Sequence, residues 1–317
     1  MAKEIIKVAL AQLAPVWLDK EATLQKVIHA IEEAARKDCS LVTFGEAFVP
    51  GYPFWLSLTD GARFNSKIQK EIHAHYVANS VSLEQGDLTA VCKTCATNNI
   101  ACILGIIELG EDRGGHSIYC TLVYVDNEGT IQNTHRKMMP TYEERLSWAQ
   151  GDGYGLRVQK LEAFTVGGLN CWENWMPLAR TALYGLGEDL HVAIWPGGLH
   201  NTHDLTRFIA KEGRSYVISV SGILRKSDIR DDIPHADLIR SHADKMISNG
   251  GSCISGPDGD WVIEPVIDKE VLLVAEIDHA RIREERQNFD PSGHYSRPDI
   301  TQLTVKRTRD NILKFKD

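Results

Sequence analysis

The amino-acid sequence predicts an α/β protein with mixed β-sheets, built as one large domain. Strand-like and helix-like segments alternate along most of the 317 residues, which is the pattern of layered α/β folds. Two turn-forming segments, 126–129 and 257–260, each separate a pair of strand-like runs and predict hairpins. No linker or repeat divides the chain. We expect one domain over residues 1–286 and a polar tail, 287–317, in contact with a neighbouring subunit.

Strands are predicted where short runs are rich in β-branched and other apolar residues. In chain order these runs are 5–13, 40–44, 100–108, 117–125, 130–137, 161–170, 192–195, 216–221, 252–255, 261–264 and 271–277. Helices are predicted where apolar residues recur at helical spacing, as Leu24, Val27 and Ile31 do, or where a stop such as Gly187 follows. These segments are 19–37, 62–80, 88–98, 177–186, 204–213 and 279–286.

Composition excludes several classes of protein. Lys and Arg total 35 against 43 for Asp and Glu, so the net charge is −8, and no basic block offers a footprint for nucleic acid or an anionic membrane. The N-terminal segment mixes charges into its apolar run and is predicted to be a first strand, not a signal peptide. Seven cysteines, an odd number scattered along a long chain, predict no disulfide framework and a reducing, cytoplasmic setting.

Cys171 is the first candidate for chemistry. It lies where a β-like run meets a helix-forming one, and a sharp turn of this kind presents a nucleophile beside helix N-terminal N–H groups. Taken alone, a buried structural thiol is the more common outcome for a cysteine.

Three charged residues complete the candidate set. Glu46 ends a strand before an apolar loop, where loss of solvent raises a carboxyl pKa toward that of a general base. Lys137 follows a predicted hairpin and offers an ammonium for developing negative charge. Glu144 alone is an ordinary helix-start acid. Taken alone, each of the three is equally explained as a solvated surface charge. Only their order along the chain points to a catalytic site.

In that order the chain resembles the nitrilase superfamily, whose signature is a Glu–Lys–Cys triad with a second Glu. Glu46, Lys137 and Cys171 match the triad, and Glu144 matches the second Glu within Pro-Thr-x-x-Glu-Arg. Three further stretches resemble family motifs: Trp-Ala-Gln-Gly-Asp-Gly at 148–153, Cys-Trp-Glu-Asn-Trp-Met-Pro-Leu at 171–178 and Asp-Pro-Ser-Gly-His-Tyr-Ser-Arg-Pro-Asp at 290–299. The resemblance spans roughly residues 5 to 300. The residues after the cysteine resemble the motif of the nitrilase branch.

Two positions depart from the family pattern. Gly45 stands where the family usually has Pro, and Ala149 stands where many nitrilases have Gly. Since glycine serves where φ is positive, Ala149 raises the question of whether its backbone needs that conformation. Neither departure removes a reacting group.

The resemblance implies a four-layer αββα sandwich with two mixed sheets, extended by dimerisation to αββααββα and assembled further into spirals. It also implies hydrolysis of a nitrile to a carboxylic acid and ammonia through a Cys171 thioimidate and thioester. By the same resemblance Tyr52, Trp172 and Trp195 line the substrate pocket, although plain core packing is an equal alternative for each. The resemblance also implies that Glu173 and His294 hold the turn that carries Cys171.

The sequence leaves two other functions open. An amidase or nitrile-to-amide hydratase on the same site differs from a nitrilase only in which group the intermediate expels. A non-catalytic assembly scaffold is the remote alternative. No cofactor and no metal are expected, because Cys92-Lys93-Thr94-Cys95 lacks a second ligand pair and no phosphate-binding glycine loop is present. The preferred nitrile is not determined.

Overall fold

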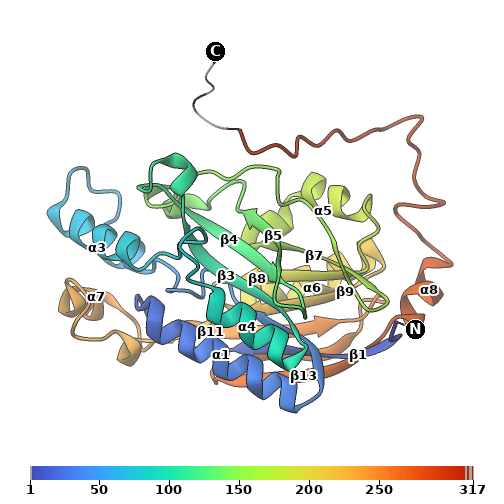
Figure 1. Ribbon diagram of the computed structural model, residues 1–317, viewed down its shortest axis with the longest axis horizontal. Helices are drawn as coiled ribbons and strands as arrows, with labels where there is room; N and C mark the ends of the chain where they lie inside the picture. The colour runs from blue at the N-terminus through green and yellow to red at the C-terminus, as the bar shows by residue number, and fades with distance from the viewer. Residues whose placement is uncertain (1, 311–312, 314–315, 317) are drawn as a thin grey trace.

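The computed structural model describes residues 2–310, 313 and 316. Its strands form two mixed sheets (Figure 1). The first sheet has the order β13-β1-β2-β3-β4-β5. Its strands are β1 (Ile5–Gln12), β2 (Cys39–Phe44), β3 (Ala101–Leu109), β4 (Ile118–Val125), β5 (Ile131–Arg136) and β13 (Val271–Asp278). β1, β2 and β3 run parallel, and the remaining neighbours pair antiparallel.

The second sheet has the order β10-β11-β9-β8-β7-β6, with β12 also paired to β11. Its strands are β6 (Gln159–Leu161), β7 (Phe164–Asn170), β8 (Leu190–Trp195), β9 (Tyr216–Ser221), β10 (Ile223–Arg225), β11 (Met246–Ser255) and β12 (Trp261–Ile267). β7, β8 and β9 are parallel. The antiparallel pairs β4–β5 and β11–β12 confirm the two predicted hairpins.

Helices cover the outer face of each sheet. The α-helices are α1 (Lys20–Arg36), α2 (Trp55–Leu58), α3 (Lys67–Ala78), α4 (Thr89–Asn98), α5 (Pro177–Tyr184), α6 (Leu199–Gly213), α7 (Ala236–His242) and α8 (Ala280–Arg286). Four short 3-10 turns accompany them: η1 (Glu111–Arg113), η2 (Tyr142–Leu146), η3 (Cys171–Trp175) and η4 (Lys226–Asp228). α1 and α4 pack on the first sheet, while α5 and α6 pack on the second. The predicted αββα layering is confirmed.

The apolar alternation of β1 shows how the layers are joined. Val8 and Leu10 point into the core between the two sheets, whereas Ala9 and Ala11 point to the core beneath α1 and α4. Successive side chains of a strand face opposite sides. One strand therefore contributes to both cores and fixes the separation of the layers.

Several helices and strands begin or end at residues other than those predicted. The 62–80 segment is helical only as α3, and the 204–213 helix begins five residues earlier as α6. The 161–170 run is divided into β6 and β7 by a turn at Glu162, whose φ is +52°. The short elements β10 and α7 were not predicted, because each is too brief to show a period in the sequence.

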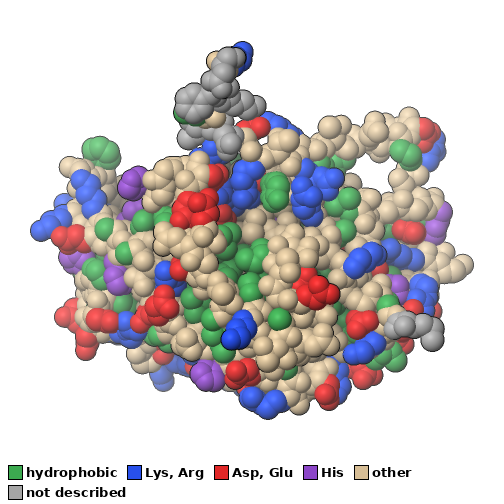
Figure 2. All heavy atoms as spheres, in the orientation of Figure 1, with side chains coloured by type: hydrophobic (Ala, Val, Ile, Leu, Met, Phe, Trp, Pro, Cys, Tyr) green, Lys and Arg blue, Asp and Glu red, His purple; other side chains and the backbone are tan. Residues whose placement is uncertain are grey.

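The tail continues past α8 without a helix or strand in its described residues, and Figure 1 shows it as an extended segment. Of the predicted tail, 311–312, 314–315 and 317 lie outside the described residues. Figure 2 shows acidic and basic side chains interspersed over the visible face. Among the helices that the structure describes, none is long and apolar enough to cross a membrane.

Candidate active site

Cys171 occupies a sharp turn between β7 and η3. Its φ is +45°, a left-handed conformation that costs a non-glycine residue about 1–3 kcal/mol and persists only when its surroundings impose it. The residue is 4% exposed. The strand-to-helix junction predicted for this cysteine is therefore present, and its backbone is strained at the thiol.

Glu46 follows β2 by two residues and is buried. Its backbone N–H donates to the Trp195 carbonyl at 3.0 Å, which attaches the end of the first sheet to the end of β8 in the second. A Cβ on Gly45 would lie 2.9 Å from the Trp195 carbonyl oxygen and 3.0 Å from the Gly222 nitrogen. Glycine at this position lets the two sheets approach closely, which accounts for the first departure from the family pattern.

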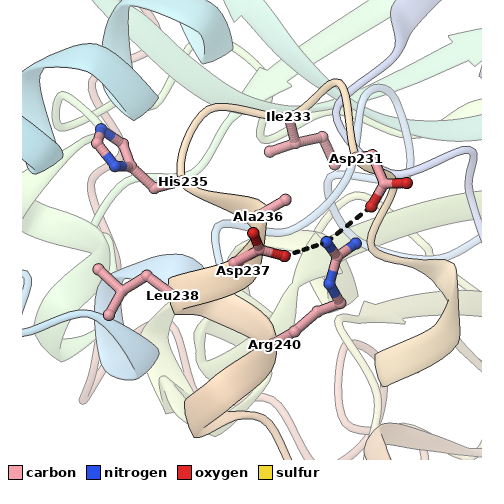
Figure 3. A pocket seen from close by; sticks show the side chains of 7 residues that line it. All are labelled: Asp231, Ile233, His235, Ala236, Asp237, Leu238 and Arg240. Atoms are coloured by element: carbon pink, nitrogen blue, oxygen red, sulfur yellow. Dashed lines mark hydrogen bonds and ion pairs between the residues drawn. The ribbon is translucent and has the colours of Figure 1, made fainter.

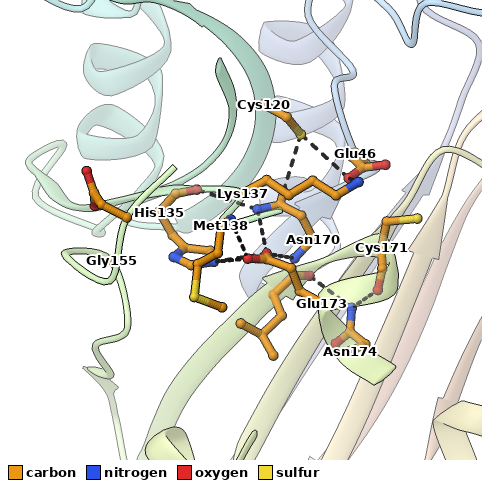
Figure 4. Close-up of polar contacts among 12 residues, drawn as sticks. Glu46, Cys120, His135, Lys137, Met138, Gly155, Asn170, Cys171, Glu173 and Asn174 are labelled. Carbon is orange, nitrogen blue, oxygen red and sulfur yellow. Dashed lines mark hydrogen bonds and ion pairs between the residues drawn. The ribbon is translucent and has the colours of Figure 1, made fainter. Parts of the chain in front are cut away.

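Lys137 follows β5 directly and is buried. Its Nζ donates to Glu46 Oε1 at 2.8 Å and to Glu144 Oε2 at 2.7 Å. Glu144 lies in η2, where a capping box with Thr141 fixes its carboxyl group. Figure 4 shows the Lys137 side chain reaching across to Glu46. The lysine thus joins two carboxyl groups that come from different parts of the chain.

The four predicted catalytic residues form one cluster. One side-chain atom from each of Glu46, Glu144 and Cys171 lies within 4.8 Å of the other two, and Lys137 bonds both carboxyl groups. Such a set of oxygen and sulfur atoms also resembles a metal site. Here the Lys137 ammonium bonds both carboxyl groups, so the chain supplies the positive charge itself.

Burial dominates the proton affinities of the cluster. Loss of solvent raises the pKa of Glu46 to about 8, although the Lys137 ammonium opposes the rise. Burial also raises the pKa of the Cys171 thiol well above its ordinary value, assisted by Glu46 and opposed by Lys137 and the Trp172 N–H. The carboxyls and the thiol overcome burial and raise the pKa of Lys137. The resting cysteine is therefore a thiol that needs a base, and Glu46 releases its proton only near pH 8.

The buried carboxylate of Glu173 connects the segment around Lys137 with the turn that carries Cys171, called the nucleophile turn below. Glu173 accepts from His135 Nε2 at 3.0 Å, from the Met138 N–H at 2.7 Å and from the Asn170 N–H at 3.0 Å (Figure 4). The pKa of Glu173 is lowered, because His135 and these N–H donors outweigh burial. Glu173 thus connects residues on both sides of Lys137 with the residue before Cys171.

A second chain of buried contacts supports the same turn from behind. Asn174 Nδ2 donates to the Cys171 carbonyl at 2.8 Å. Asn174 Oδ1 meets His191 Nε2 at 2.7 Å, and His191 Nδ1 meets Glu188 Oε1 at 2.9 Å. These contacts restrain the backbone of the strained cysteine.

Sequence reasoning missed several of these residues. They are Cys120, His135, Asn170, Asn174, Glu188 and His191. One signal was available: Asn170 and Glu173 are three apart, the spacing of a capping box, and they form one. The contacts of Cys120 and His135, and that of His191 with Asn174, instead join residues that are far apart in the sequence.

The predicted pocket residues differ in position. The Tyr52 hydroxyl donates to Glu144 Oε1 at 2.7 Å, so it touches the cluster. The Trp172 ring is 45% exposed and stacks on Trp175 at 5.1 Å. Trp195 is fully buried and packs against Cys171 from the interior, with its indole N–H donating to Ser219. Its side chain is thus part of the core behind the thiol.

His294 is not brought to the nucleophile turn in this chain. It lies exposed on the segment after α8, and its ring contacts Tyr295 at 5.3 Å. Ala149 has no positive φ, and its N–H donates to the Ile118 carbonyl at 2.9 Å. Alanine therefore fits this backbone, which removes the question that the second departure raised.

A surface hollow elsewhere does not belong to this site. About 490 Å³ of space lies around α7, where Arg240 pairs with Asp231 at 2.7 Å and with Asp237 at 2.6 Å (Figure 3). Neither the four clustered residues nor Tyr52, which bonds Glu144, lines it. Its arginine is already paired within the hollow.

Two stacked mixed sheets carry a buried thiol beside a lysine and two carboxyl groups, a set that a hydrolase can use for nucleophilic attack. The carbon-nitrogen hydrolase profile matches residues 7–287. The chain belongs to the carbon-nitrogen hydrolase family.

Relatives support this assignment along nearly the whole chain. The sequence is 34% identical over 314 residues to a protein named nitrilase 2 from an unknown prokaryotic organism, covering 98% of this chain and 96% of that one. It is also 34% identical over 312 residues to an aliphatic nitrilase of Rhodococcus rhodochrous, covering 95% and 79%. A carbon-nitrogen hydrolase structure from Helicobacter pylori matches with a TM-score of 0.71 at 19% identity, covering 93% and 96%, and shares the fold.

Proposed function

We propose that this enzyme is a nitrilase, which hydrolyses an organic nitrile to the carboxylic acid and ammonia. The relatives named nitrilase support the substrate class. The observation that carries the proposal is Lys137 Nζ bonded to both Glu46 and Glu144 beside the Cys171 thiol. Nucleophile, base and cation are within reach of one small electrophilic carbon, which is what attack on a nitrile requires.

In the first step, Cys171 Sγ bonds to the nitrile carbon and its proton passes to Glu46. Glu46 Oε2 is suited to this, because it is buried and has no hydrogen-bond partner in the described part of the chain. The nitrile nitrogen gains electrons as the carbon–nitrogen triple bond becomes double. The Lys137 ammonium stabilises that charge and supplies the proton, which Glu46 returns to it. The product is a thioimidate.

In the second step, water adds to the thioimidate carbon with Glu46 or Glu144 as the base. Expulsion of ammonia leaves a thioester, and a second water releases the acid and restores the thiol. If the tetrahedral intermediate expels the thiolate instead, the product is an amide. The outcome depends on which leaving group receives the proton first.

The test measures ammonia released from aliphatic, aryl and arylacetonitriles, with the matching amides run in parallel. Wild type, Cys171→Ala and Cys92→Ser are compared. Cys92 is a partly buried cysteine on α4, outside the cluster, and controls for loss of a thiol. We expect nitrile-dependent ammonia in wild type and Cys92→Ser, and none in Cys171→Ala.

Two other outcomes would replace the proposal. Turnover of amides alone, or accumulation of amide from nitriles, would make the enzyme an amidase or a hydratase on the same site. Activity that survives in Cys171→Ala would exclude the cysteine mechanism. A correctly folded wild type without turnover of any nitrile or amide would favour the scaffold alternative.

We further propose that residues 1–286 form the hydrolase domain and that the tail, 287–317, contacts other subunits in a cytoplasmic homodimer that assembles into spirals. The exposed, extended course of the described tail supports the contact, and seven free cysteines are consistent with a reducing compartment. Light scattering of the full chain and of a chain ending at residue 286 tests the assembly. The same number of subunits per particle in both chains would contradict the assembly through the tail.

A further inference from the structure

A cavity of about 520 Å³ adjoins the catalytic cluster. Its lining includes Tyr52, whose hydroxyl donates to Glu144 Oε1 at 2.7 Å. It also includes Asn201, whose Oδ1 accepts from the Trp172 indole at 3.4 Å, and Trp172 is the residue after Cys171. The volume lies within the range of small-molecule pockets, roughly 300–1,000 Å³. This cavity is therefore placed to receive the part of a substrate that lies beyond its nitrile carbon.

Two carboxyl groups and one histidine, His200, line this cavity. Glu143 and Asp268 both line the cavity, and no Lys or Arg does. Neither carboxyl group has an ion pair among the residues that the structure describes. The apolar part of the lining includes the Tyr52 and Phe54 rings, whose centroids are 4.7 Å apart. A ligand here meets an aromatic wall and two carboxyl groups, of which Asp268 is exposed and Glu143 is partly buried.

A second, smaller cavity near the turn that carries Cys171 is lined by charged residues of both signs. It measures about 260 Å³ and is lined by Trp172, Glu173 and Arg145, among others. If the far end of the substrate entered this cavity, Arg145 would favour a carboxylate. The two cavities therefore make different predictions about substrate charge. The larger one is favoured because Tyr52 connects its wall directly to Glu144.

We propose that the substrate is a nitrile with an apolar body whose far end is neutral or carries a protonated amine, and that the acidic cavity discriminates against nitriles bearing a carboxylate. This inference rests on the proposed nitrilase function and names the substrate class of the same site. A carboxylate entering beside Glu143 and Asp268 is repelled, whereas an ammonium is attracted. Both effects weaken as salt screens the charges.

The test compares three nitriles of similar length: 6-aminohexanenitrile, heptanenitrile and 5-cyanopentanoate. We expect kcat/KM to fall in that order, with about a tenfold difference between amine and carboxylate at low ionic strength. The combined variant Glu143→Gln, Asp268→Asn is expected to compress the series, as is added salt. Glu128→Gln, an exposed acid in the β4–β5 turn, changes the net charge without touching the cavity and should leave the series unchanged.

A measurement of nitrile binding tests this inference separately from the proposed nitrilase function. Calorimetry of the three nitriles with Cys171→Ala should give the same order of affinity without any turnover. An equal affinity for all three, or a series that Glu128→Gln alters as much as the cavity variant does, would overturn the inference. A preference for the carboxylate that Arg145→Gln abolishes would also overturn it and assign the smaller cavity. Absence of Cys171-dependent ammonia from every nitrile would instead overturn the nitrilase function.

Discussion

Cys120 Sγ lies 3.5 Å from Glu46 Oε1, the same oxygen that accepts from Lys137 Nζ at 2.8 Å. The Cys120 thiol is buried on β4 and also lies 3.7 Å from Asn170 Oδ1. It remains protonated, because burial and the charge of Glu46 raise its pKa well above the ordinary value. The enzyme therefore carries a second thiol whose S–H donates to the carboxyl group beside the nucleophile. Both donors bond to Oε1, which leaves Oε2 for the proton of Cys171.

Replacement of Cys120 should shift the pH dependence of the reaction. An S–H donor favours the ionised carboxylate, so Cys120→Ala should raise the pKa of Glu46. Cys120→Ser, with a stronger donor, should lower it. The groups that face Glu46 are Lys137 from the end of β5, Glu144 from η2 and Cys171 from the nucleophile turn, and none of them is altered. Since a weak hydrogen bond is worth roughly 0.5–1 kcal/mol, the acid limb of kcat/KM should move by about half a pH unit in opposite directions.

The matched control is Cys253→Ser. Cys253 is also buried and donates to Thr206 Oγ1 at 3.5 Å, away from the cluster. A pH profile of kcat/KM for each variant tests whether the Cys120 thiol shifts the pKa of Glu46. If Cys120→Ala and Cys120→Ser both lower activity equally at all pH values, the thiol only fills space.

Glu46→Gln tests the raised pKa of the base through protein stability. The folded protein holds the Glu46 proton up to about pH 8, whereas the unfolded chain releases it near the ordinary value of 4.5. The folded state therefore binds more protons between these values, and stability falls as pH rises through the window. Thermal unfolding from pH 5 to 9 should show a decline in wild type, on the order of a few kcal/mol, that is smaller in Glu46→Gln. Parallel curves for the two proteins would show that Glu46 titrates normally.

The pH dependence of the reaction should also show the raised pKa of Glu46. With Glu46 as the base, kcat/KM of wild type should rise with pH toward about 8, well above the ordinary carboxyl range. Glu46→Gln should lose activity by about 10²–10⁴-fold. Glu128→Gln, with the same change in charge on an exposed turn, should retain both the activity and the profile.

Local patterns in the sequence were sufficient to predict most strands and helices, whereas the four layers and the cluster followed from the family resemblance. Val8 and Leu10 alternate with Ala9 and Ala11, so β1 could be predicted as a strand with two apolar faces. The triad was found through motif resemblance, and the structure brings its members together.

What the sequence could not predict depends on contacts between distant residues. Cys120 and Glu46 are 74 positions apart and meet because β4 and β2 both flank β3 in the first sheet. The position of the Trp195 side chain behind the thiol follows from the parallel pairing of β7 and β8, which brings Ala193 and Ile194 beside Leu169 and Asn170. A motif names residue types and does not give the direction in which a ring points.

Lys137→Met should destabilise the fold and abolish turnover. It removes the only side chain that bonds both Glu46 and Glu144 in the described structure. Two buried carboxyl groups then face each other without a cation, at a cost of roughly 3–5 kcal/mol. Adding Glu144→Gln should recover part of the lost stability but none of the activity. Urea unfolding of both single variants and the double variant gives the coupling energy. Additive losses would show that the lysine and Glu144 act independently.

Glu173→Gln tests whether the turn that holds Cys171 requires a charged carboxylate. Glutamine keeps the shape but loses the charge that receives His135 and the N–H groups of Met138 and Asn170. Hydrogen bonds to a charged group are worth about 1.5–3 kcal/mol each, so stability at neutral pH should fall by a few kcal/mol. The alkylation rate of Cys171 by iodoacetamide should also fall, and kcat should decrease with KM little changed.

The pH dependence of that loss distinguishes charge from packing. The pKa of Glu173 is lowered in the folded protein, so its carboxylate stabilises the fold above the ordinary value of 4.5 and ceases to do so as pH falls through the folded value. The difference in unfolding free energy between wild type and Glu173→Gln should therefore shrink in acid. If the difference is constant down to the lowest pH at which the protein folds, the two side chains differ only in packing. The charge would then have no part in holding the nucleophile.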